Sequence, residues 1–534
     1  MKEPQKNELL QIIKFIYNHH KTYLKAIIIT IILSVLVTFL LPKKYRSTGI
    51  IFPTFSNSLE DTYNNLMFGY DVKADRILQL LQSQEVDAKE QEIMRPYIPL
   101  GILYISAWLQ KHQYDNEIFD STFQSFESQK SFILLHKPNV IGLYTNLMTK
   151  LNVLRLIQFV KSNDALKHTK IVLGGPEVRN HVKNFLTHGA DYIVLGEGEE
   201  TMLELVQFLD GKTNKTINEI EGVSFLNEQQ EVVQNKERLK IKELSDLPFP
   251  NRTKVNLQLY FDAWKQKHGT SAISINTMRG CPYSCNWCSR AVYGQSYRRR
   301  SAKNVVDEIE WIQSNYEVDS VWFVDDVFTV SHKWLNEFNE ELQSRNIKMP
   351  YECITRADRM NEAVILDLKS SGCFRVWIGA ESGSQKVIDL MDRRVDVNQV
   401  REMIQLSQLH GIQAGTFIMV GYTGETEDDI FETVNHLKVS NPDIFTITVA
   451  YPIKGTPLYH EVEDRFIANL PWETSTDRDI DFKRTYSRKY YNYAVSMIVN
   501  EVNAYKAQQK GEVLKMSKAK LKAVIQRGRM YLAR

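Results

Sequence analysis

The sequence predicts an α/β protein with two series of alternating strands and helices, an apolar segment near the N-terminus and a helical C-terminal end. The length of 534 residues suggests two or three domains rather than one core. Short apolar runs alternate with helical periodicity, a pattern that favours parallel sheets. In the second series, reactive side chains recur directly after the strands, which favours an α/β barrel or part of one.

The apolar segment is residues 23–41, "YLKAIIITIILSVLVTFLL", in which Lys25 is the only charged residue. Its length is close to the roughly 20 residues that span a bilayer, so we expect a transmembrane helix and attachment to a membrane. A signal peptide is the alternative, but the long polar lead-in and the lack of a small-residue cleavage site weaken it. Lysines flank both ends of the segment, so charge does not predict its orientation.

The first α/β series covers residues 95–240. "PLGILYISAWLQKHQY" predicts a helix, and "NEIFD", "VIGLYTN", "KIVLGGP" and "DYIVLGEG" predict strands. Ligands of open α/β sheets bind beyond the carboxyl ends of the strands. Plain turns are the alternative reading of the candidate ligand-binding residues at these ends, which are Gly174, Gly175, Pro176, Gly196, Glu197, Gly198 and Glu199.

A proline-punctuated linker, residues 241–265, leads to the second series, residues 266–464. Ser301 is a candidate N-cap for a helix that turns Val305, Val306, Ile309 and Ile312 inward. Another helix is predicted from Val400, Met403, Ile404 and Leu409, and Gly411 ends it. Residues 465–534 predict a helical, basic C-terminal extension.

Polar or reactive residues follow each strand of the second series. "SAISINT" runs into a cysteine-containing loop, and the later strand ends carry Asp325, Asp326, Arg356, Glu381, Ser382, Gly421, Glu425, Tyr451 and Pro452. Chance would scatter such residues over both ends of the strands. The sequence therefore predicts a site on the carboxyl-end face of the barrel.

The cysteine-containing loop, "RGCPYSCNWCSR", has Cys281, Cys285 and Cys288 in a C-x3-C-x2-C spacing. Five cysteines in all do not form a disulfide framework, and a reducing cytosolic environment fits better. A structural zinc site needs four closed ligands, whereas a three-cysteine [4Fe–4S] cluster leaves one iron open. Zinc remains the alternative metal, and no base partner marks a catalytic cysteine.

This loop, with Pro282 and Trp287, resembles the radical SAM superfamily over about residues 271–464. The resemblance implies that Cys281, Cys285 and Cys288 ligate a [4Fe–4S] cluster. The cluster would bind S-adenosylmethionine and cleave it reductively to a 5′-deoxyadenosyl radical, with electrons from a flavodoxin- or ferredoxin-type donor. It also implies S-adenosylmethionine contacts for Asp325, Asp326, Arg356, Glu381, Ser382, Gly421, Glu425, Tyr451 and Pro452. "WFVDDVF" departs from the family's usual glycine–glycine–glutamate motif, and Tyr422-Thr423 replace a lone proline.

The first series resembles the Rossmann-like cobalamin-binding domain of the B12-dependent branch, on "PLGILYISAWL", "VLGGPE" and "VLGEGEET". This implies cobalamin over the strand ends. "DSTFQSF", from Asp120, has no histidine, which implies cobalamin without a histidine ligand from that loop. The family's first strand has no counterpart immediately before Arg95, so the sheet is predicted to be incomplete.

Residues 1–86 resemble the start of polysaccharide chain-length determinant proteins, which place the part after their first membrane helix outside the cytoplasm. A cluster that needs reductant and S-adenosylmethionine must lie inside, so we expect the catalytic domains to be cytoplasmic. This conflict favours a fused fragment as the origin of residues 1–86.

The resemblance implies an enzyme that methylates an unactivated centre of an unknown substrate. A radical cyclase or rearrangement enzyme of the anaerobic magnesium-protoporphyrin cyclase type is the enzymatic alternative. An inactive fusion acting as a membrane factor in polysaccharide assembly is the non-enzymatic one. The net charge of +2 gives no whole-molecule reason to expect a nucleic-acid partner.

Overall fold

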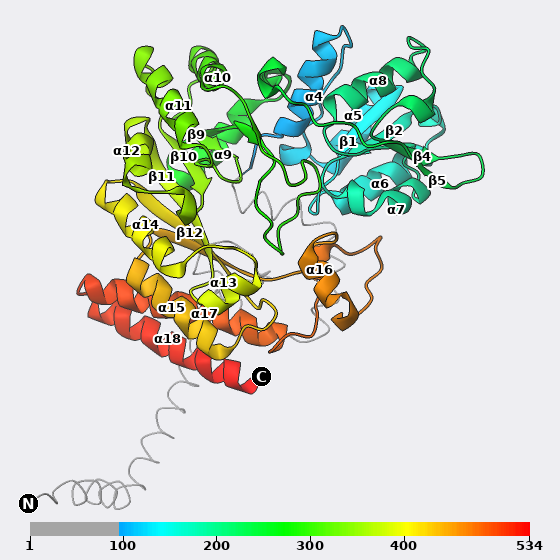
Figure 1. The fold of residues 1–534 in the computed structure, drawn as a ribbon. Coiled ribbons are helices and arrows are strands. Elements are labelled where there is room, and N and C mark those ends of the chain that lie inside the picture. The colour runs from blue at the N-terminus through cyan, green and yellow to red at the C-terminus, as the bar shows by residue number, and fades with distance from the viewer. Residues whose placement is uncertain (1–95) are drawn as a thin grey trace, which may run out of the picture. The chain divides into compact units, whose positions relative to one another are not determined.

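The computed structural model describes residues 96–534, which carry a mixed five-stranded sheet, a parallel six-stranded sheet and a helical C-terminal end (Figure 1). All of these residues belong to the larger of the chain's two units, Phe55–Arg534. Within them, no helix combines the length and apolar character that crossing a membrane requires. The predicted transmembrane helix at 23–41 and the resemblance over residues 1–86 lie outside the described residues.

The first sheet has five strands in the order β1-β2-β3-β4-β5. β1 (Val140–Tyr144), β2 (Lys170–Gly174) and β3 (Tyr192–Val194) are parallel, whereas β4 (Val223–Leu226) and β5 (Val232–Gln234) form an antiparallel hairpin at one edge. The helices of this domain are α4 (Leu100–Lys111), α5 (Phe126–His136), α6 (Lys150–Lys161), α7 (Val182–Thr187) and α8 (Glu199–Leu209). The predicted helix after Pro99 and three of the four predicted strands are confirmed.

The fourth predicted strand, "NEIFD", is wrong. Residues 114–119 have no regular secondary structure, and among the described residues no strand pairs with the free edge of β1. A strand is held by hydrogen bonds to a neighbouring strand, so an apolar run without such a neighbour stays an irregular segment. Among residues 96–534, β1 is therefore an edge strand of this sheet.

The second sheet has six parallel strands in the order β13-β12-β11-β10-β9-β6, the arrangement of a partial (β/α)6 barrel. The strands are β6 (Ala272–Ile275), β9 (Ser320–Phe323), β10 (Tyr351–Thr355), β11 (Cys373–Glu381), β12 (Gln413–Val420) and β13 (Ile444–Val449). A short antiparallel ribbon, β7 (Met278–Arg279) and β8 (Arg298–Arg299), flanks the cysteine-containing loop. The helices are α9 (Leu257–His268), α10 (Ala302–Asn315), α11 (His332–Ser344), α12 (Glu362–Ser370), α13 (Gln385–Leu390), α14 (Val397–Leu409), α15 (Glu427–Ser440), α16 (Pro457–Val462), α17 (Arg488–Gln509) and α18 (Val513–Leu532).

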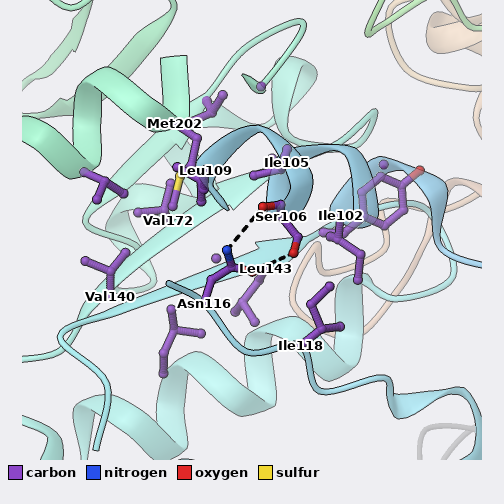
Figure 2. Close-up of a pocket in the computed structure, with 18 of the residues that line it drawn as sticks. Ile102, Ile105, Ser106, Leu109, Asn116, Ile118, Val140, Leu143, Val172 and Met202 are labelled. Atoms are coloured by element: carbon purple, nitrogen blue, oxygen red, sulfur yellow. Dashed lines mark hydrogen bonds between the residues drawn. The ribbon is translucent and has the colours of Figure 1, made fainter. Parts of the chain in front are cut away.

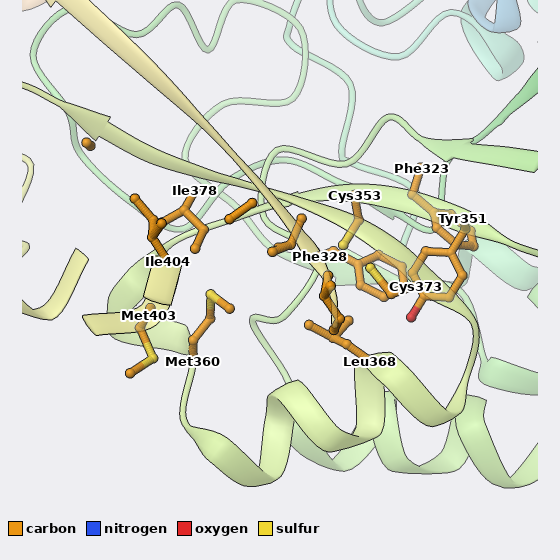
Figure 3. Close-up of a cluster of buried hydrophobic side chains, with 14 of the residues drawn as sticks. Phe323, Phe328, Tyr351, Cys353, Met360, Leu368, Cys373, Ile378, Met403 and Ile404 are labelled. Atoms are coloured by element: carbon orange, nitrogen blue, oxygen red, sulfur yellow. The ribbon is translucent and has the colours of Figure 1, made fainter. Parts of the chain in front are cut away.

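The barrel core lies between the six-stranded sheet and its helices (Figure 3). Ser301 caps α10 by accepting a hydrogen bond from Asn304 N, and the four apolar residues predicted to turn inward are buried. Leu409 does not line the core as predicted, because it is 78% exposed at the end of α14. The neighbouring strands β10 and β11 bring Cys353 and Cys373 together deep in this core, where they pack with Phe323, Phe328 and Tyr351.

Candidate functional site

The strand ends of the six-stranded sheet hold the predicted site residues. Asp325 and Asp326 follow β9, Arg356 follows β10, Glu381 ends β11 and Gly421 follows β12. Parallel strands place their carboxyl ends on one side of the sheet, so these residues share one face. The local contacts of each side chain decide what it can do there.

The cysteine-containing loop is anchored to the segment after α13. Asn286 N donates to Met391 O over 3.0 Å, and Ser284 Oγ donates to the Asp392 carboxylate over 2.6 Å. Gly280, just before Cys281, has a φ of +85°, and a Cβ there would lie 2.3 Å from Ser296 Oγ. Only glycine fits such a position without moving the backbone, so the start of the loop requires Gly280.

The three loop cysteines are free thiols, with Cys285 buried and Cys281 and Cys288 half-buried. The pKa of Cys288 is raised to about 12, mainly by burial and also by the nearby charges of Asp326, Cys285 and Cys281. The three sulfurs and the Asp326 carboxylate are therefore close enough for their charges to affect one another. Within residues 96–534, no three His, Cys, Asp or Glu side chains are arranged as a metal-ligand set.

Asp325 and Asp326 are adjacent but differ in environment. The Asp325 carboxylate is buried and accepts hydrogen bonds from Thr277 N over 2.7 Å, from Met278 N over 3.1 Å and from the Thr277 hydroxyl. Asp326 makes no hydrogen bond or ion pair with the described part of the chain. The Asp326 side chain is exposed. The pKa of its carboxyl is nevertheless raised, because the surrounding protein partly desolvates it and the Asp325 carboxylate lies next to it. Asp326 is therefore the member of the pair that faces the site with an available acceptor.

Arg356 is buried and occupied by contacts with the cysteine-containing loop and its anchor. Its guanidinium donates to Asp358 over 2.8 Å and to Arg393 O over 2.7 Å, and it stacks 3.8 Å from the Tyr283 ring centroid. Its Nη1 also lies 3.8 Å from Cys285 Sγ. Arg356 thus holds the loop, and its Nη1 group points toward the Cys285 sulfur.

Arg393, which the sequence did not single out, sits on the other side of Cys285. Its Nη1 lies 3.7 Å from Cys285 Sγ, and its Nη2 donates to Gly379 O over 3.0 Å. Its Nε has no hydrogen-bond partner among the described residues although it is buried. Two guanidinium groups therefore flank one cysteine sulfur, and charged donors near an iron–sulfur cluster influence its reduction potential.

Glu381 is held at the end of β11 in an uncommon backbone conformation. Its φ is +66°, in the left-handed region that non-glycine residues rarely adopt. The carboxylate lies 3.6 Å from Arg393, while burial raises its pKa. The next residue, Ser382, is fully buried, and its hydroxyl accepts from Ser384 N. Glu381 is thus placed toward Arg393, and the Ser382 hydroxyl shapes the turn that follows.

The loop after β12 packs against the C-terminal helices. Gly421 has a φ of +79°, and a Cβ there would lie 2.9 Å from Arg484 Nη1. Gly421 N donates to the buried Glu425 carboxylate over 2.5 Å, and burial raises the pKa of Glu425 to about 8. The structure thus gives Glu425 an internal role in this loop. Tyr451 is half-buried and Pro452 is buried after β13.

A cavity of about 830 Å³ lies at the carboxyl ends of β1, β2 and β3 and continues along the free edge of β1 (Figure 2). Figure 2 shows the β1-edge part, where Ile105 and Leu109 of α4 face Val140 and Leu143, and Asn116 hydrogen-bonds Ser106. The seven glycine-rich residues predicted at the strand ends all line the cavity: Gly174, Gly175, Pro176, Gly196, Glu197, Gly198 and Glu199. The structure therefore brings together in one cavity the two turns that the sequence placed at separate strand ends.

Buried ion pairs join this cavity to the cysteine-containing loop. Arg279, two residues before Cys281, donates to Glu197 over 2.8 Å and to Glu199 over 2.5 Å. Arg298, opposite Arg279 in the β7–β8 ribbon, donates to the other Glu197 oxygen over 2.5 Å. The Glu197 carboxylate thus has both oxygens engaged by arginines, so its negative charge is compensated within the protein.

Family models match the two halves of this site. Residues 92–206 match the B12 binding domain, and residues 275–437 match the radical SAM superfamily. The chain contains a B12-binding domain followed by a radical SAM domain. It is an enzyme of the radical SAM class, and its cofactors are a [4Fe–4S] cluster, S-adenosylmethionine and cobalamin.

Relatives and solved structures agree with this domain order. An uncharacterized methyltransferase from Pyrococcus horikoshii is 24% identical over 71% of this chain and 82% of its own length. An anaerobic magnesium-protoporphyrin IX monomethyl ester cyclase from Rubrivivax gelatinosus is 27% identical over 70% of this chain and 68% of its own. The fold is similar to that of the cobalamin-dependent S-adenosylmethionine radical enzyme OxsB, with a TM-score of 0.66 and 17% identity over 82% of this chain and 71% of OxsB. It is also similar to the radical S-adenosylmethionine methyltransferase TsrM from Kitasatospora setae, with a TM-score of 0.58 and 16% identity over 69% of this chain and 72% of TsrM.

The residues of both domains fit these cofactors. The radical SAM domain offers three free thiols on one loop, and a bound cluster would stabilise their thiolate forms against the burial that raises the pKa of Cys281 and Cys288. The B12-binding domain offers a largely apolar cavity with glycine turns at its strand ends, where bare backbone allows close approach. Gly175 is required there, because a Cβ would lie 2.4 Å from Thr145 O.

Sequence reasoning missed Arg279 and Arg298, which connect the two domains, and Arg393, which flanks Cys285 within the radical SAM domain. The available signals were the arginine before Gly280 and the arginine runs in "YRRRS" and "MDRRV". The partners of Arg279 and Arg298, however, are between 80 and 101 residues away in the chain. Only the packing of the two domains pairs them.

Proposed function

We propose that this chain is a cobalamin-dependent radical SAM methyltransferase that transfers a methyl group to an unactivated centre of its substrate. The observation that carries the proposal is the ion-paired junction at Arg279. This arginine lies two residues before the first loop cysteine and binds Glu197 and Glu199 in the turn that lines the cavity of the B12-binding domain. Methyltransferases recur among the similar proteins, which favours methyl transfer over cyclisation. When bound, the cluster and S-adenosylmethionine supply a hydrogen-abstracting radical, and cobalamin supplies the methyl group.

The chain's own residues would bind and orient these groups. Cys281, Cys285 and Cys288 would hold the cluster, and the open carboxylate of Asp326 would accept hydrogen bonds from the amino group of S-adenosylmethionine. Arg356 and Arg393 flank Cys285 and Glu381 pairs with Arg393, so these three residues would position the cluster and the methionine end beside it. Asp325, Ser382, Gly421 and Glu425 would act indirectly by fixing the strand ends, and Tyr451 and Pro452 would lie nearer the adenine.

In the B12-binding domain, the backbone turns at Gly174–Pro176 and Gly196–Glu199 would support cobalamin. We assign the carboxylates of Glu197 and Glu199 to the junction with the radical SAM domain, because both already bind Arg279. We further propose a flavodoxin- or ferredoxin-type electron donor. Membrane attachment through residues 23–41 is also proposed, on their sequence alone.

The test is anaerobic reconstitution of the full chain with iron, sulfide and hydroxocobalamin, followed by reductant and S-adenosylmethionine. The expected products are 5′-deoxyadenosine and S-adenosylhomocysteine, the latter because methyl transfer consumes a methyl donor. Cys285→Ala should abolish 5′-deoxyadenosine, whereas Cys353→Ala, a cysteine in the barrel core, should retain it. Product formation that survives Cys285→Ala would refute the assignment.

One observation supports the cyclase alternative, the 27% identity to the Rubrivivax gelatinosus cyclase. A cyclase would form 5′-deoxyadenosine without S-adenosylhomocysteine when its substrate is supplied. The ratio of the two products therefore distinguishes the candidates, and the absence of both in reconstituted protein would favour an inactive barrel.

A further inference from the structure

The last helix, α18, presents an apolar face to solvent. It packs on α17, beside which it lies in Figure 1, through the buried side chains Ala523, Gln526 and Met530. The opposite side of α18 exposes Val513, Leu514, Leu521, Val524, Ile525, Tyr531 and Leu532, of which Leu514 is 87% and Leu532 is 90% exposed. Single exposed leucines are ordinary, but a row of apolar side chains along one helix indicates a surface for a partner.

Helical periodicity gathers these exposed side chains into a single stripe. At about 100° per residue, they fall within an arc of roughly 120°, centred away from the face that packs on α17. Basic residues border the stripe on both sides: Lys515, Lys518, Lys522 and Arg529 on one side, and Lys520 and Arg527 on the other. No aspartate or glutamate occurs from Val513 to Arg534.

This charge pattern selects among partners. A second copy of the chain would bring two strongly positive helices together, which like-charge repulsion opposes. A nucleic acid would match the positive charge but has no apolar surface on which the seven aliphatic and aromatic side chains of the stripe could be buried. An anionic membrane surface offers both, because acyl chains accept the stripe and phosphates accept the flanking lysines and arginines.

We propose that α18 docks the protein on an anionic lipid surface, with the stripe from Leu514 to Leu532 inserted among the headgroups. The flanking basic side chains extend along the helix and place their charged ends at the level of the phosphates. Arg527 is the exception, because its guanidinium lies 4.6 Å from the Phe431 ring centroid and so packs on α15. The proposal rests on α18 alone and is independent of the cofactor assignment and of residues 23–41.

Vesicle flotation of the full chain tests the stripe. The triple variant Leu514→Gln/Leu521→Gln/Leu532→Gln should partition at least about tenfold less to vesicles of phosphatidylcholine with phosphatidylglycerol. Each substitution removes the favourable free energy of transferring a leucine side chain from water into lipid. Leu409→Gln, which removes a comparably exposed leucine on α14, should partition like the unsubstituted chain. Equal flotation of the triple variant and the unsubstituted chain would overturn the proposal, provided that a local probe agrees.

The local probe separates α18 from any other membrane-binding segment and does not depend on the triple variant folding. Leu521→Trp should gain fluorescence quenching by brominated phosphatidylglycerol beyond that of the unsubstituted chain, whereas Leu409→Trp should gain none. No additional quenching at position 521 would show that α18 stays out of the lipid and would overturn the proposal.

Charge provides the second arm. Lys518→Gln and Lys520→Gln take one lysine from each flank, and each should lower binding to anionic vesicles by about fivefold. Neither should change binding to pure phosphatidylcholine, and added salt should reproduce their effect. A lipid-free dimer that the leucine variants abolish would replace the membrane with a second copy, and RNA that displaces vesicle-bound protein through the stripe would replace it with a nucleic acid.

Discussion

Two adjacent aspartates at the end of β9 have separate roles, and substitution distinguishes them. Asp325→Ala should lower the free energy of unfolding by about 2–4 kcal/mol, because Thr277 N and Met278 N lose a buried acceptor. Asp326→Ala should change it by less than about 0.5 kcal/mol, since its carboxylate makes no hydrogen bond or ion pair with the described residues. Urea unfolding measures both of these changes, and equilibrium dialysis of S-adenosylmethionine on reconstituted protein tests the binding role of Asp326.

In dialysis, Asp326→Ala should bind S-adenosylmethionine more weakly. Asp326→Asn keeps an acceptor but loses the charge. Its affinity for S-adenosylmethionine should therefore lie between those of Asp326→Ala and the unsubstituted chain. If Asp325→Ala left stability unchanged while Asp326→Ala unfolded the protein, the assignment of the two roles would be reversed.

Glu425 predicts a pH-dependent stability. Burial raises the pKa of this carboxyl from 4.5 to about 8, so it is protonated in the folded state at neutral pH. Unfolding then releases a proton between about pH 4.5 and pH 8, and the free energy of unfolding falls as pH rises through that window. Glu425→Gln keeps an acceptor for Gly421 N and removes the titration, so it should gain on the order of 1–3 kcal/mol over the unsubstituted chain at pH 8.

Urea unfolding at pH 5.5 and pH 8.5 measures this effect. The gain of Glu425→Gln should be smaller at the lower pH, and the exposed Glu402→Gln should show no such trend. A Glu425→Gln variant whose stability followed pH as the unsubstituted chain does would show that Glu425 is ionised in the folded protein.

At the scale of elements, Arg279 links the β7–β8 ribbon to the first residue of α8. Arg279→Met leaves the buried carboxylates of Glu197 and Glu199 without this cation, which should lower the free energy of unfolding by about 3–5 kcal/mol. Arg345→Met breaks partly exposed pairs to Asp307 and Glu341, and should cost less than about 1 kcal/mol. Chemical denaturation of both variants gives the comparison.

A second substitution shows whether the orphaned charge is the cause. Adding Glu199→Gln to Arg279→Met removes one uncompensated carboxylate, so it should recover part of the lost stability. If the double variant were as unstable as the sum of the two single variants, the loss would come from packing around Arg279 rather than from charge.

Elements differ in how well the sequence predicted them, and the difference has a local cause. α10 follows from its own residues, since Ser301 supplies the cap and four apolar residues share one face. The predicted strand at "NEIFD" fails because a strand depends on a partner elsewhere in the chain, and no described strand pairs with the adjacent edge of β1. The prediction that Leu409 points inward fails because periodicity does not tell at which residue a helix stops packing against its neighbours.

At the scale of the whole molecule, the C-terminal helices contribute unequally to the barrel. α17 buries Tyr490, Tyr491, Ala494, Met497, Ile498 and Val502 in the barrel core, whereas α18 buries Ala523, Gln526 and Met530. A chain that ends at Lys510 should therefore fold, and one that ends at Thr485 should not. At about 1.5–3 kcal/mol per large apolar side chain, losing α17 removes as much as the whole stability of a typical domain.

Near-ultraviolet circular dichroism and thermal unfolding of the two truncated chains test this. The chain ending at Lys510 should keep its aromatic signal and a cooperative transition. A cooperative transition in the chain ending at Thr485 would show that the barrel is closed without α17.

The sequence by itself determined the cysteine-containing loop, the order of the two domains and the strand ends that face the site. These follow from spacing and periodicity, which act between residues close in the chain. Only the tertiary structure decided that Asp325 is structural while Asp326 is open, that Glu197 and Glu199 bind arginines, and that Arg393 flanks Cys285. Those outcomes depend on which distant side chains neutralise a buried charge, and a buried charge takes whichever partner the packing of two domains brings within hydrogen-bond distance.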